Sequence, residues 1–438
     1  MVFCIFGVWR LEFGVDEFVR VLLLSTTTGY QLRSFGEAAD RLGIELLLAT
    51  DRCHHLDDPW RDGAIPVRFY DDDASLEAIE AAARQRPIDG VIAVGDRPTT
   101  LAARAAAALG LQGNPVAAAE ITRSKRAMRR AFTYARLEVP WFIDLPSSAD
   151  PRLIGTAIPY PCVVKPLGLS GSRGVIRANS SEQLVAAVKR IRALLSRPEL
   201  RAQRTGLLDE LIVEGYLEGQ EYAVEGLLTG GELRVLAVFD KPDPLIGPFF
   251  EETIYVTPPP IPTTLERAIA AEVQRAVSAI GLVHGPVHAE CRVGPAGVVM
   301  LEVAARPIGG MCSTVLRFQT ANGEMASFEE VLLRHACGED VSGYVREEQA
   351  SGVMMIPIPK RGVYKAVAGE ERALGVPHIN DLRITAKADQ LIEPLPEGDS
   401  YLGFIFAAAP DAVSVVAALR AAHGRLAFEI QPELPVNR

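Results

Sequence analysis

The sequence contains few cysteines and no long apolar run. Its cysteines are Cys4, Cys53, Cys162, Cys291, Cys312 and Cys337. They form no C-x-x-C pair and no regular spacing, which argues against a disulfide framework. Three of them lie within apolar runs, as free buried thiols of a reducing compartment do. Because no stretch of about 18 uncharged apolar residues occurs, we expect a cytoplasmic protein without a membrane partner.

The chain also lacks an excess of positive charge. Its net charge of −10 argues against nucleic acid or an anionic membrane as the main partner, although a local basic pocket for phosphates remains compatible with it. The apolar start, residues 1–9, has no basic segment before it and is followed by Glu12 and Asp16, so it makes a poor signal peptide. Residues 1–19 precede the first expected strand, and we interpret them as either an extra edge element or an upstream start codon.

Several common catalytic motifs are missing. No G-x-G-x-x-G follows the first expected strand, which excludes a dinucleotide fingerprint. No Gly-Lys-Ser/Thr opens a helix as a Walker A loop does, and there is no G-x-S-x-G elbow or plausible Cys–His nucleophile pair. The cluster Cys53-His54-His55 lacks further metal ligands at a suitable spacing, so we interpret it as a polar loop.

A chain of 438 residues is too long for one core, and its patterns divide it into several units. Apolar runs at 21–24, 44–49 and 90–94 alternate with helical patterns at 35–42, 75–86 and 101–109. This alternation predicts a parallel sheet covered on both faces. A capped helix is expected over 121–135, with Thr122 or Ser124 near its start.

A charged, proline-containing stretch at 196–204 divides the region that follows this helix. After residue 348, strand patterns at 382–386 and 401–407 and a helix near 410–423 indicate a small α+β unit. The predicted fold class is therefore α/β and α+β. The predicted domains are 1–116, 117–204, 205–348 and 349–438.

The first segment that carries chemistry joins a strand to a glycine-rich loop. Lys165-Pro166 ends an apolar strand, and the loop 167–174 returns into another apolar strand at Val175. Three glycines and two serines can bring several backbone N–H groups onto one anion, and Lys165 adds a positive charge for phosphate oxygens. The alternative interpretation is a β-hairpin with a flexible tip.

The second segment is an apolar strand that stops at Glu214 and resumes near Glu221 as an alternating strand. An interrupted strand leaves backbone groups free to pair with a flat heterocycle. Glu221 could then hold a ribose diol through charge-assisted hydrogen bonds. A hairpin with acidic surface residues is the alternative.

The third segment is a hairpin whose turn centres near Ala296. Antiparallel pairing then places Glu290 opposite Glu302 and His288 opposite Ala304. Because side chains alternate along a strand, Glu290, Glu302 and Arg306 share one face, and Leu301, Val303 and Ala305 point into a core. Two opposed carboxylates favour a cation between them, for which Mg²⁺ is suited. The alternative is a surface hairpin whose acids pair with Arg292 and Arg306.

The order of these segments resembles the ATP-grasp superfamily. Lys165-Pro166, the Gly/Ser loop, the Glu214–Glu221 segment and the two glutamates followed by Arg306 occur in the order and at the spacing of that superfamily. The block 301–310 is most similar to the branch of L-amino-acid ligases, or dipeptide synthases. The resemblance covers the chain from about residue 21 onward. It implies an N-terminal pre-ATP-grasp domain, a two-lobed ATP-grasp fold and a C-terminal domain.

The resemblance also implies a role for each matching residue. Lys125 and Lys165 would contact the nucleotide phosphates of ATP. The loop residues Ser170, Gly171, Ser172 and Gly174 would close over the β- and γ-phosphates. Glu214 and the backbone at Leu217 would bind adenine, and Glu221 the ribose. Glu290 and Glu302 would ligate Mg²⁺, for which Mn²⁺ can substitute.

On the substrate side, Arg306 would stabilise an acyl-phosphate and the tetrahedral intermediate. Lys241 and Glu251 match a region that approaches substrate, and Glu251 would hold an amino group. His288 would orient substrate, or it is a packed histidine. Many members of the superfamily carry Asn two residues after the second glutamate, where this chain has Ala304, which leaves the number of metal ions open.

We therefore expect an ADP-forming ligase that joins a small-molecule carboxylate to an amine, both of them amino acids. Two alternatives remain: an enzyme of purine or carboxylation type that uses formate or bicarbonate, and a non-catalytic nucleotide-binding module. The oligomeric state stays open, and a homodimer is compatible with an acidic chain of this size.

Overall fold

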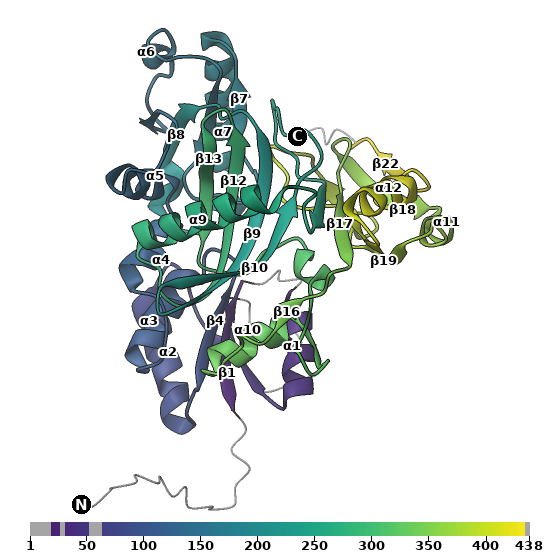
Figure 1. Cartoon of the computed structure of the whole chain (residues 1–438). Helices are drawn as coiled ribbons and strands as arrows, with labels where there is room; N and C mark the ends of the chain where they lie inside the picture. The colour runs from purple at the N-terminus through teal and green to yellow at the C-terminus, as the bar shows by residue number, and fades with distance from the viewer. Residues whose placement is uncertain (1–18, 27–30, 52–63, 434–438) are drawn as a thin grey trace, which may run out of the picture.

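The computed structural model describes residues 19–26, 31–51 and 64–433 (Figure 1). The Cys53-His54-His55 cluster and nearly all of the 1–19 extension lie outside these residues. Within them, no helix has the length and apolar character needed to cross a membrane. The N-terminal unit lies beneath two lobes, and the C-terminal unit lies at their side (Figure 1).

The N-terminal unit contains the expected parallel sheet, in the order β3-β2-β1-β4. Its strands are β1 Arg20–Ser25, β2 Glu45–Thr50, β3 Ile65–Pro66 and β4 Gly90–Val94, and its helices are α1 Gln31–Leu42, α2 Asp72–Gln85 and α3 Thr99–Ala108. Alternate residues of β1 enter two different cores, since Val21 and Leu23 pack in one and Leu22 and Leu24 in the other. Burial on both faces explains the continuous apolar runs.

One cover of this sheet comes from a distant part of the chain. Helix α10, Phe328–Ala336, packs beside α1 and against β4 (Figure 1). A Cβ at Gly90 would lie 2.6 Å from the carbonyl oxygen of Ala336, so only glycine permits this approach. The N-terminal unit is thereby joined to the large lobe through a shared core.

The helix expected over 121–135 is confirmed with Ser124 at its start, but its predicted first residues, 121 and 122, belong to a separate helix. Two helices occupy the segment, α4 Val116–Thr122 and α5 Lys125–Tyr134. The helical conformation is interrupted at Ser124, whose backbone is extended (φ −128°) and whose hydroxyl accepts a hydrogen bond from the Ala127 amide. An N-cap of this kind begins a new helix rather than continuing one.

The small lobe is an antiparallel sheet in the order β5-β8-β6-β7, with helix α7, Ser181–Leu195, packed on it. Its strands are β5 Phe142–Pro146, β6 Cys162–Pro166, β7 Ile176–Ala178 and β8 Glu210–Gly215. Short helices α6, Arg152–Gly155, and α8, Pro198–Arg201, and a 3-10 turn, Gly206–Asp209, lie between strands. Since β8 lies between β5 and β6, the sheet continues past the boundary expected at 204.

The large lobe is part of an eight-stranded sheet in the order β13-β12-β9-β10-β11-β17-β21-β19. Five strands precede residue 348: β9 Gln220–Thr229, β10 Glu232–Asp240, β11 Ile254–Thr257, β12 Gly285–Gly294 and β13 Gly297–Ala304. Three follow it: β17 Ala350–Ile356, β19 Ile379–Ile384 and β21 Gly403–Ala409. Helix α9, Thr263–Ile280, packs on this sheet. Hydrogen bonds thus join the C-terminal unit to the large lobe across the boundary expected at 348.

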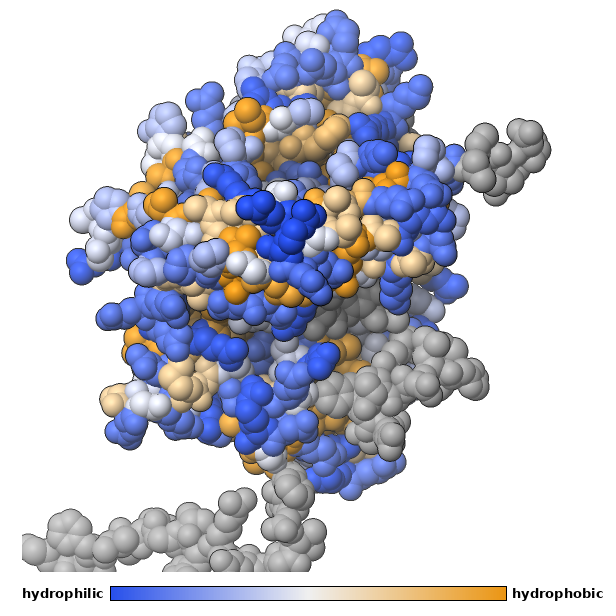
Figure 2. Space-filling view, turned by 90° about the vertical axis from the view of Figure 1, so that its right-hand side faces the viewer, coloured by the Kyte–Doolittle hydropathy of each residue, from blue (hydrophilic) through white to orange (hydrophobic). Residues whose placement is uncertain are grey.

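Smaller elements complete the fold. A sheet in the order β15-β14-β16 is formed by β14 Arg317–Gln319, β15 Met325–Ser327 and β16 Val345–Arg346. A second one, β20-β18-β22, is formed by β18 Gly362–Ala368, β20 Leu391–Ile392 and β22 Ala427–Gln431. Helices α11, Glu370–Leu374, and α12, Ala412–His423, pack together in the C-terminal unit. On the face shown in Figure 2, hydrophilic side chains predominate and apolar ones lie scattered among them.

The predicted hairpin register is confirmed where the acids lie. Glu290 pairs with Glu302, and His288 pairs with Ala304. Nearer the turn the register shifts by one residue, because Cys291 faces Met300 and Leu301 is left as the extra residue of a bulge. Leu301 therefore lines a cavity, and its expected place in the core was wrong, whereas Val303 is buried as expected.

The segment from Glu214 to Glu221 passes from one lobe to the other. Strand β8 belongs to the small lobe and β9 to the eight-stranded sheet, which excludes the hairpin alternative. Strand β9 is buried along eight consecutive residues, so it is not the half-exposed alternating strand that we expected. Its two faces pack into different cores, with Ala223 in one and Val224 in the other.

Candidate active site

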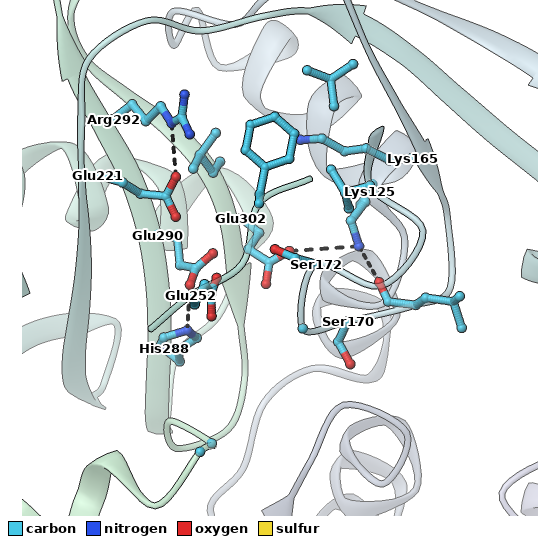
Figure 3. Close-up of a pocket in the computed structure, with 18 of the residues that line it drawn as sticks. Lys125, Lys165, Ser170, Ser172, Glu221, Glu252, His288, Glu290, Arg292 and Glu302 are labelled. Carbon is cyan, nitrogen blue, oxygen red and sulfur yellow. Dashed lines mark hydrogen bonds and ion pairs between the residues drawn. The ribbon is translucent and has the colours of Figure 1, made fainter. Parts of the chain in front are cut away.

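A cavity of about 210 Å³ lies between the small and large lobes. Most of the predicted site residues line it: Lys125, Lys165, Ser170, Gly171, Ser172, Glu214, Leu217, Glu221, His288, Glu290, Glu302 and Arg306. Lys241, Glu251 and Gly174 do not. In the close-up, the labelled lysines and serines approach from one side, His288, Glu221 and Glu290 from the other, and Glu302 lies between them (Figure 3).

Lys165 on the small-lobe wall is held by a buried acid. Glu214 is 2% exposed and forms ion pairs with Lys165 and with Arg129, whose Nε lies 3.0 Å from Glu214 Oε2. Burial raises the pKa of Glu214, but the charges of Arg129 and Lys165 outweigh this effect and bring the pKa to about 2. The carboxylate is thus already paired, which leaves backbone groups for the adenine contact expected of this segment.

Lys125 at the start of α5 joins the Gly/Ser loop to the opposite wall. Its Nζ donates to the carbonyl oxygen of Leu169 over 2.6 Å and lies 3.9 Å from Glu302 Oε2 (Figure 3). The strands on either side of the loop, β6 and β7, pair with each other, so the loop is the tip of a β-hairpin, as the alternative interpretation has it. The tip lines the cavity.

Gly174 is turned toward the C-terminal unit. Its amide donates to the carbonyl oxygen of Pro396 over 2.9 Å. Next to it, Arg173 Nη1 lies 2.8 Å from Asp399 Oδ2. These contacts hold the far end of the loop against the segment 396–399, which explains why Gly174 does not line the cavity.

The large-lobe wall surrounds a buried lysine with three carboxylates. Lys241 is 3% exposed, and its Nζ lies 2.7 Å from Glu221 Oε1, 3.0 Å from Glu252 Oε1 and 2.6 Å from Glu290 Oε1. These acids are spaced closely enough to hold a metal ion, but the ammonium group already bonds to each of them. Lys241 is therefore a counter-ion inside the wall, which contradicts its expected approach to substrate.

His288 is fixed from behind by Glu225. Glu225 is fully buried, its Oε1 lies 2.6 Å from His288 Nδ1, and its Oε2 accepts from the Ile308 amide over 3.0 Å. Burial lowers the pKa of His288, but the adjacent carboxylates dominate and raise it to about 9. Its Nε2 lies 3.5 Å from Glu290 Oε1 (Figure 3). The ring is packed, as one of the two expected interpretations has it, and because it also lines the cavity, the orientation of substrate by His288 stays a prediction.

Glu252, not Glu251, contributes to the cavity wall. Glu252 Oε2 accepts a hydrogen bond from the Tyr255 hydroxyl over 2.8 Å, and burial raises the pKa of Glu252. Neighbouring residues of an extended chain point to opposite sides. The sequence did not show which of the two acids faces inward, because the segment before β11 carries no clear alternation.

The N-terminal unit supplies an acid that the sequence analysis missed. Arg306 Nε lies 2.9 Å from Oδ1 of Asp96, which follows β4. Burial raises the pKa of Asp96, but the charge and hydrogen bonds of Arg306 outweigh it, and the pKa is lowered overall. An acid just beyond the carboxyl end of a parallel strand is the available sequence signal, since ligands bind at that edge.

Arg292 and two residues of the C-terminal region were also missed. Arg292 Nε lies 2.9 Å from Glu221 Oε2 (Figure 3), and Lys241 is paired with the other oxygen of Glu221. A ribose hydroxyl that binds Glu221 as expected would therefore have to compete with these two ion pairs. Alternation from Glu290 places Arg292 on the same face and could have revealed it. Met355 and Tyr401 also line the cavity, and no local pattern marks them.

The donors at Glu290 and Glu302 suit a hard divalent cation. They face each other across the strand pair and offer carboxylate oxygens, the ligands that Mg²⁺ prefers. Within the part of the chain that the structure describes, the ion pair of Glu302 is the long one to Lys125, which leaves its oxygens accessible. Ala304 opposite His288 offers no further ligand.

Three family models match consecutive parts of the chain. Residues 36–113 match the ATP-grasp N-terminal domain, residues 158–315 the ATP-grasp domain, and residues 354–431 the L-amino acid ligase C-terminal domain 2. These ranges lie in the N-terminal unit, in the two lobes and in the C-terminal unit, in that order.

Known proteins show the same likeness. The crystal structure of L-amino acid ligase from Bacillus licheniformis has a TM-score of 0.81 at 26% identity, covering 95% of this chain and all of that one. Alanine–anticapsin ligase from Bacillus subtilis is 28% identical over 53% of this chain and 52% of that protein. D-alanine–D-alanine ligase from Syntrophotalea carbinolica is 27% identical over 57% and 73% respectively. The chain is therefore an ATP-grasp ligase with the C-terminal domain of L-amino acid ligases.

Proposed function

We propose that this chain joins the carboxylate of one amino acid to the amino group of another, with ATP as the energy source. One observation carries the proposal: a single cavity brings the phosphate-type donors Lys125, Lys165 and the Gly/Ser loop to within reach of Glu302 and Arg306. Such a cavity can hold a nucleotide phosphate and a substrate carboxylate side by side. The relatives named for ligases of alanine support the choice of amino acids.

In the first step, an oxygen of the substrate carboxylate attacks the γ-phosphorus of ATP. The bond from that phosphorus to the bridging oxygen breaks, ADP leaves, and an acyl-phosphate forms. Lys125 and the loop 170–172 hold the transferring group and spread its charge. Mg²⁺, or Mn²⁺ in its place, would be held by Glu290 and Glu302 and would neutralise phosphate oxygens.

In the second step, the amine nitrogen attacks the carbonyl carbon of the acyl-phosphate. Arg306 stabilises the oxyanion of the tetrahedral intermediate, from a position fixed by Asp96. The carbon–oxygen bond then breaks, orthophosphate leaves, and the proton from nitrogen passes to phosphate or water. The product is an amide, so no covalent bond to the protein is needed.

Two further expectations stay proposals. A cytoplasmic location is supported by the thiols of Cys162, Cys291, Cys312 and Cys337, which are all free. A homodimer is testable by light scattering on the purified protein.

The test is phosphate release from ATP and Mg²⁺ across a matrix of L-amino acids, singly and in pairs. Release that depends on a pair, with a condensed product by mass spectrometry, is the expected result. Release that depends on formate or bicarbonate would assign the alternative reaction. Nucleotide binding without release for any acid would assign the non-catalytic function. If Glu302→Ala retained Mg²⁺-dependent turnover, the assignment of the metal site would be wrong.

A further inference from the structure

A second, smaller cavity lies beside the phosphate end of the main one. It has a volume of about 50 Å³ and shares Lys125, Leu169, Ser170 and Glu302 with the main cavity. Its other lining residues include Asp96 and Arg97 after β4, Thr122 and Arg123 in the turn before α5, and three residues of the segment 203–207. Three separate units of the chain therefore meet around it.

Among the side chains around this second cavity, the positive charges outnumber the negative ones. Its cations are Arg97, Arg123 and Lys125, and its acids are Asp96 and Glu302. Asp96 already pairs with Arg306, and Arg97 Nη1 lies 3.3 Å from Asp51 Oδ2. The charge that remains favours an anion.

Arg123 is the cation with the weakest internal partner. Its guanidinium donates to the Thr100 hydroxyl over 3.4 Å, and among the described residues no carboxylate lies within 4.0 Å of it. Burial lowers the pKa of Arg123; the charge of Asp72 opposes this effect, and the charge of Arg97 adds to it, so the pKa is lowered overall. An arginine kept half-buried near a second arginine without an ion pair is stabilised when an oxyanion binds between them.

The backbone around the second cavity reinforces this preference. Lys125 begins α5, a helix of ten residues, so the positive end of the helix dipole lies at the wall. Asp96 and Arg97 follow the carboxyl end of β4, the edge at which parallel sheets bind ligands. The volume suffices for a few waters or one small oxyanion and excludes a nucleotide.

From this arrangement we infer that the second cavity is a subsite for a small oxyanion, with Arg123 as its main ligand. The inference rests on the proposed ligase function, which supplies two such anions beside Ser170 and Lys125. One is the orthophosphate released from the acyl-phosphate, and the other is the free carboxylate of the amino acid that acts as amine. Both present oxygens that arginine binds in the same way.

The test compares wild type with Arg123→Gln, with the charge-retaining Arg123→Lys, and with Arg130→Gln as a matched control. Arg130 lies on the same helix α5, is largely exposed, pairs with Asp144 over 2.7 Å and lines neither cavity. Binding of orthophosphate and of acetate is measured by calorimetry at saturating ADP, which requires no turnover. Arg123→Gln should weaken binding of at least one anion about tenfold. Arg123→Lys should restore most of it, and Arg130→Gln should behave as wild type.

Kinetics separate the two sources. If orthophosphate is the ligand, Arg123→Gln raises the inhibition constant for phosphate about tenfold and leaves the KM of the amine substrate unchanged. If the carboxylate is the ligand, KM rises for the amino acid but not for its amide. Equal anion binding by wild type and a folded Arg123→Gln would overturn the subsite. Absence of ligation in wild type would instead overturn the proposed function, while calorimetry still decides the subsite.

Discussion

The two walls of the main cavity differ in the charges on which the site was predicted, lysines on one and carboxylates on the other, and each wall contains a buried counter-ion of the other sign. On the small-lobe wall, Glu214 neutralises Lys165. On the large-lobe wall, Lys241 bonds to three carboxylates. The charges that a motif contributes are therefore not the charges that a ligand meets. After these internal pairs are accounted for, Lys125 and Glu302 are left facing each other at 3.9 Å.

The physical reason is the cost of burying charge. An ion removed from water needs a partner, and removing one member of a buried pair is more costly than the pair is stabilising. The internal counter-ions thus hold the walls in shape, while the long Lys125–Glu302 contact is weak enough for a nucleotide and a metal ion to replace it. The following experiments test this division between structural and ligand-facing charges.

The largest effect is expected from Lys241→Met. It leaves Glu221, Glu252 and Glu290 without their shared cation, so the free energy of unfolding should fall by about 3–5 kcal/mol. Lys125→Met removes a cation that is not enclosed and should instead raise the KM for ATP with little loss of stability. Urea denaturation and steady-state kinetics measure both effects. Equal denaturation midpoints for the two variants would break the comparison.

Arg306→Gln tests a charge that faces the reaction. The variant keeps a polar side chain that can donate hydrogen bonds, but it is shorter and loses the cation at the expected oxyanion, so kcat should fall by about 10²–10³. Binding of ATP, measured by calorimetry, should change little, because the lysines and the Gly/Ser loop remain. An unchanged kcat would show that Arg306 serves only to bind Asp96 of the N-terminal unit.

Acid denaturation should reveal the counter-ion of the small-lobe wall. The pKa of Glu214 in the folded chain, about 2, lies below its ordinary value of 4.5. The ion pairs of Glu214 therefore stabilise the fold fully above about pH 4.5, and this stabilisation is lost as the pH falls toward 2. It amounts to at most about 3 kcal/mol.

The Glu214→Gln variant should be less stable than wild type at neutral pH. This difference in stability should shrink as the pH falls from 4.5 to 2. Thermal midpoints recorded across this range measure the difference. A constant gap between the two proteins would mean that Glu214 stabilises the wall through packing rather than charge.

The smallest effect separates two neighbouring acids. Glu252→Gln changes a cavity-lining carboxylate and should raise the KM of an amino acid substrate by about tenfold at most. Glu251→Gln changes an acid that does not line the cavity and should leave kcat and KM within about twofold. If Glu251→Gln had the larger effect, the expected contact of Glu251 with the substrate amino group would be right after all.

Local patterns were sufficient for much of the fold and of the site. Apolar runs located three of the four strands of the N-terminal sheet, since burial on both faces leaves few polar positions, whereas the short strand β3 was not predicted. Alternation and a turn near Ala296 predicted the pairing of Glu290 with Glu302. The N-terminal strands and this pairing both depend on residues close in sequence. The bulge at Leu301 was missed because an alternating pattern does not show where one strand has an extra residue.

Contacts between distant segments were decided by the tertiary structure alone. Nothing near Lys241 in the sequence shows that it bonds to Glu221 and Glu290, and nothing near Tyr401 shows that it lines the main cavity, because the residues around them lie far away in the sequence. The same holds for the ion pair between Glu214 and Lys165 and for the ion pair between Glu221 and Lys241. The sequence by itself determined which chemical groups are available and in what order. The packing of the lobes decided which of those groups neutralise one another and which remain to bind a ligand, because charge pairing depends on distance in space.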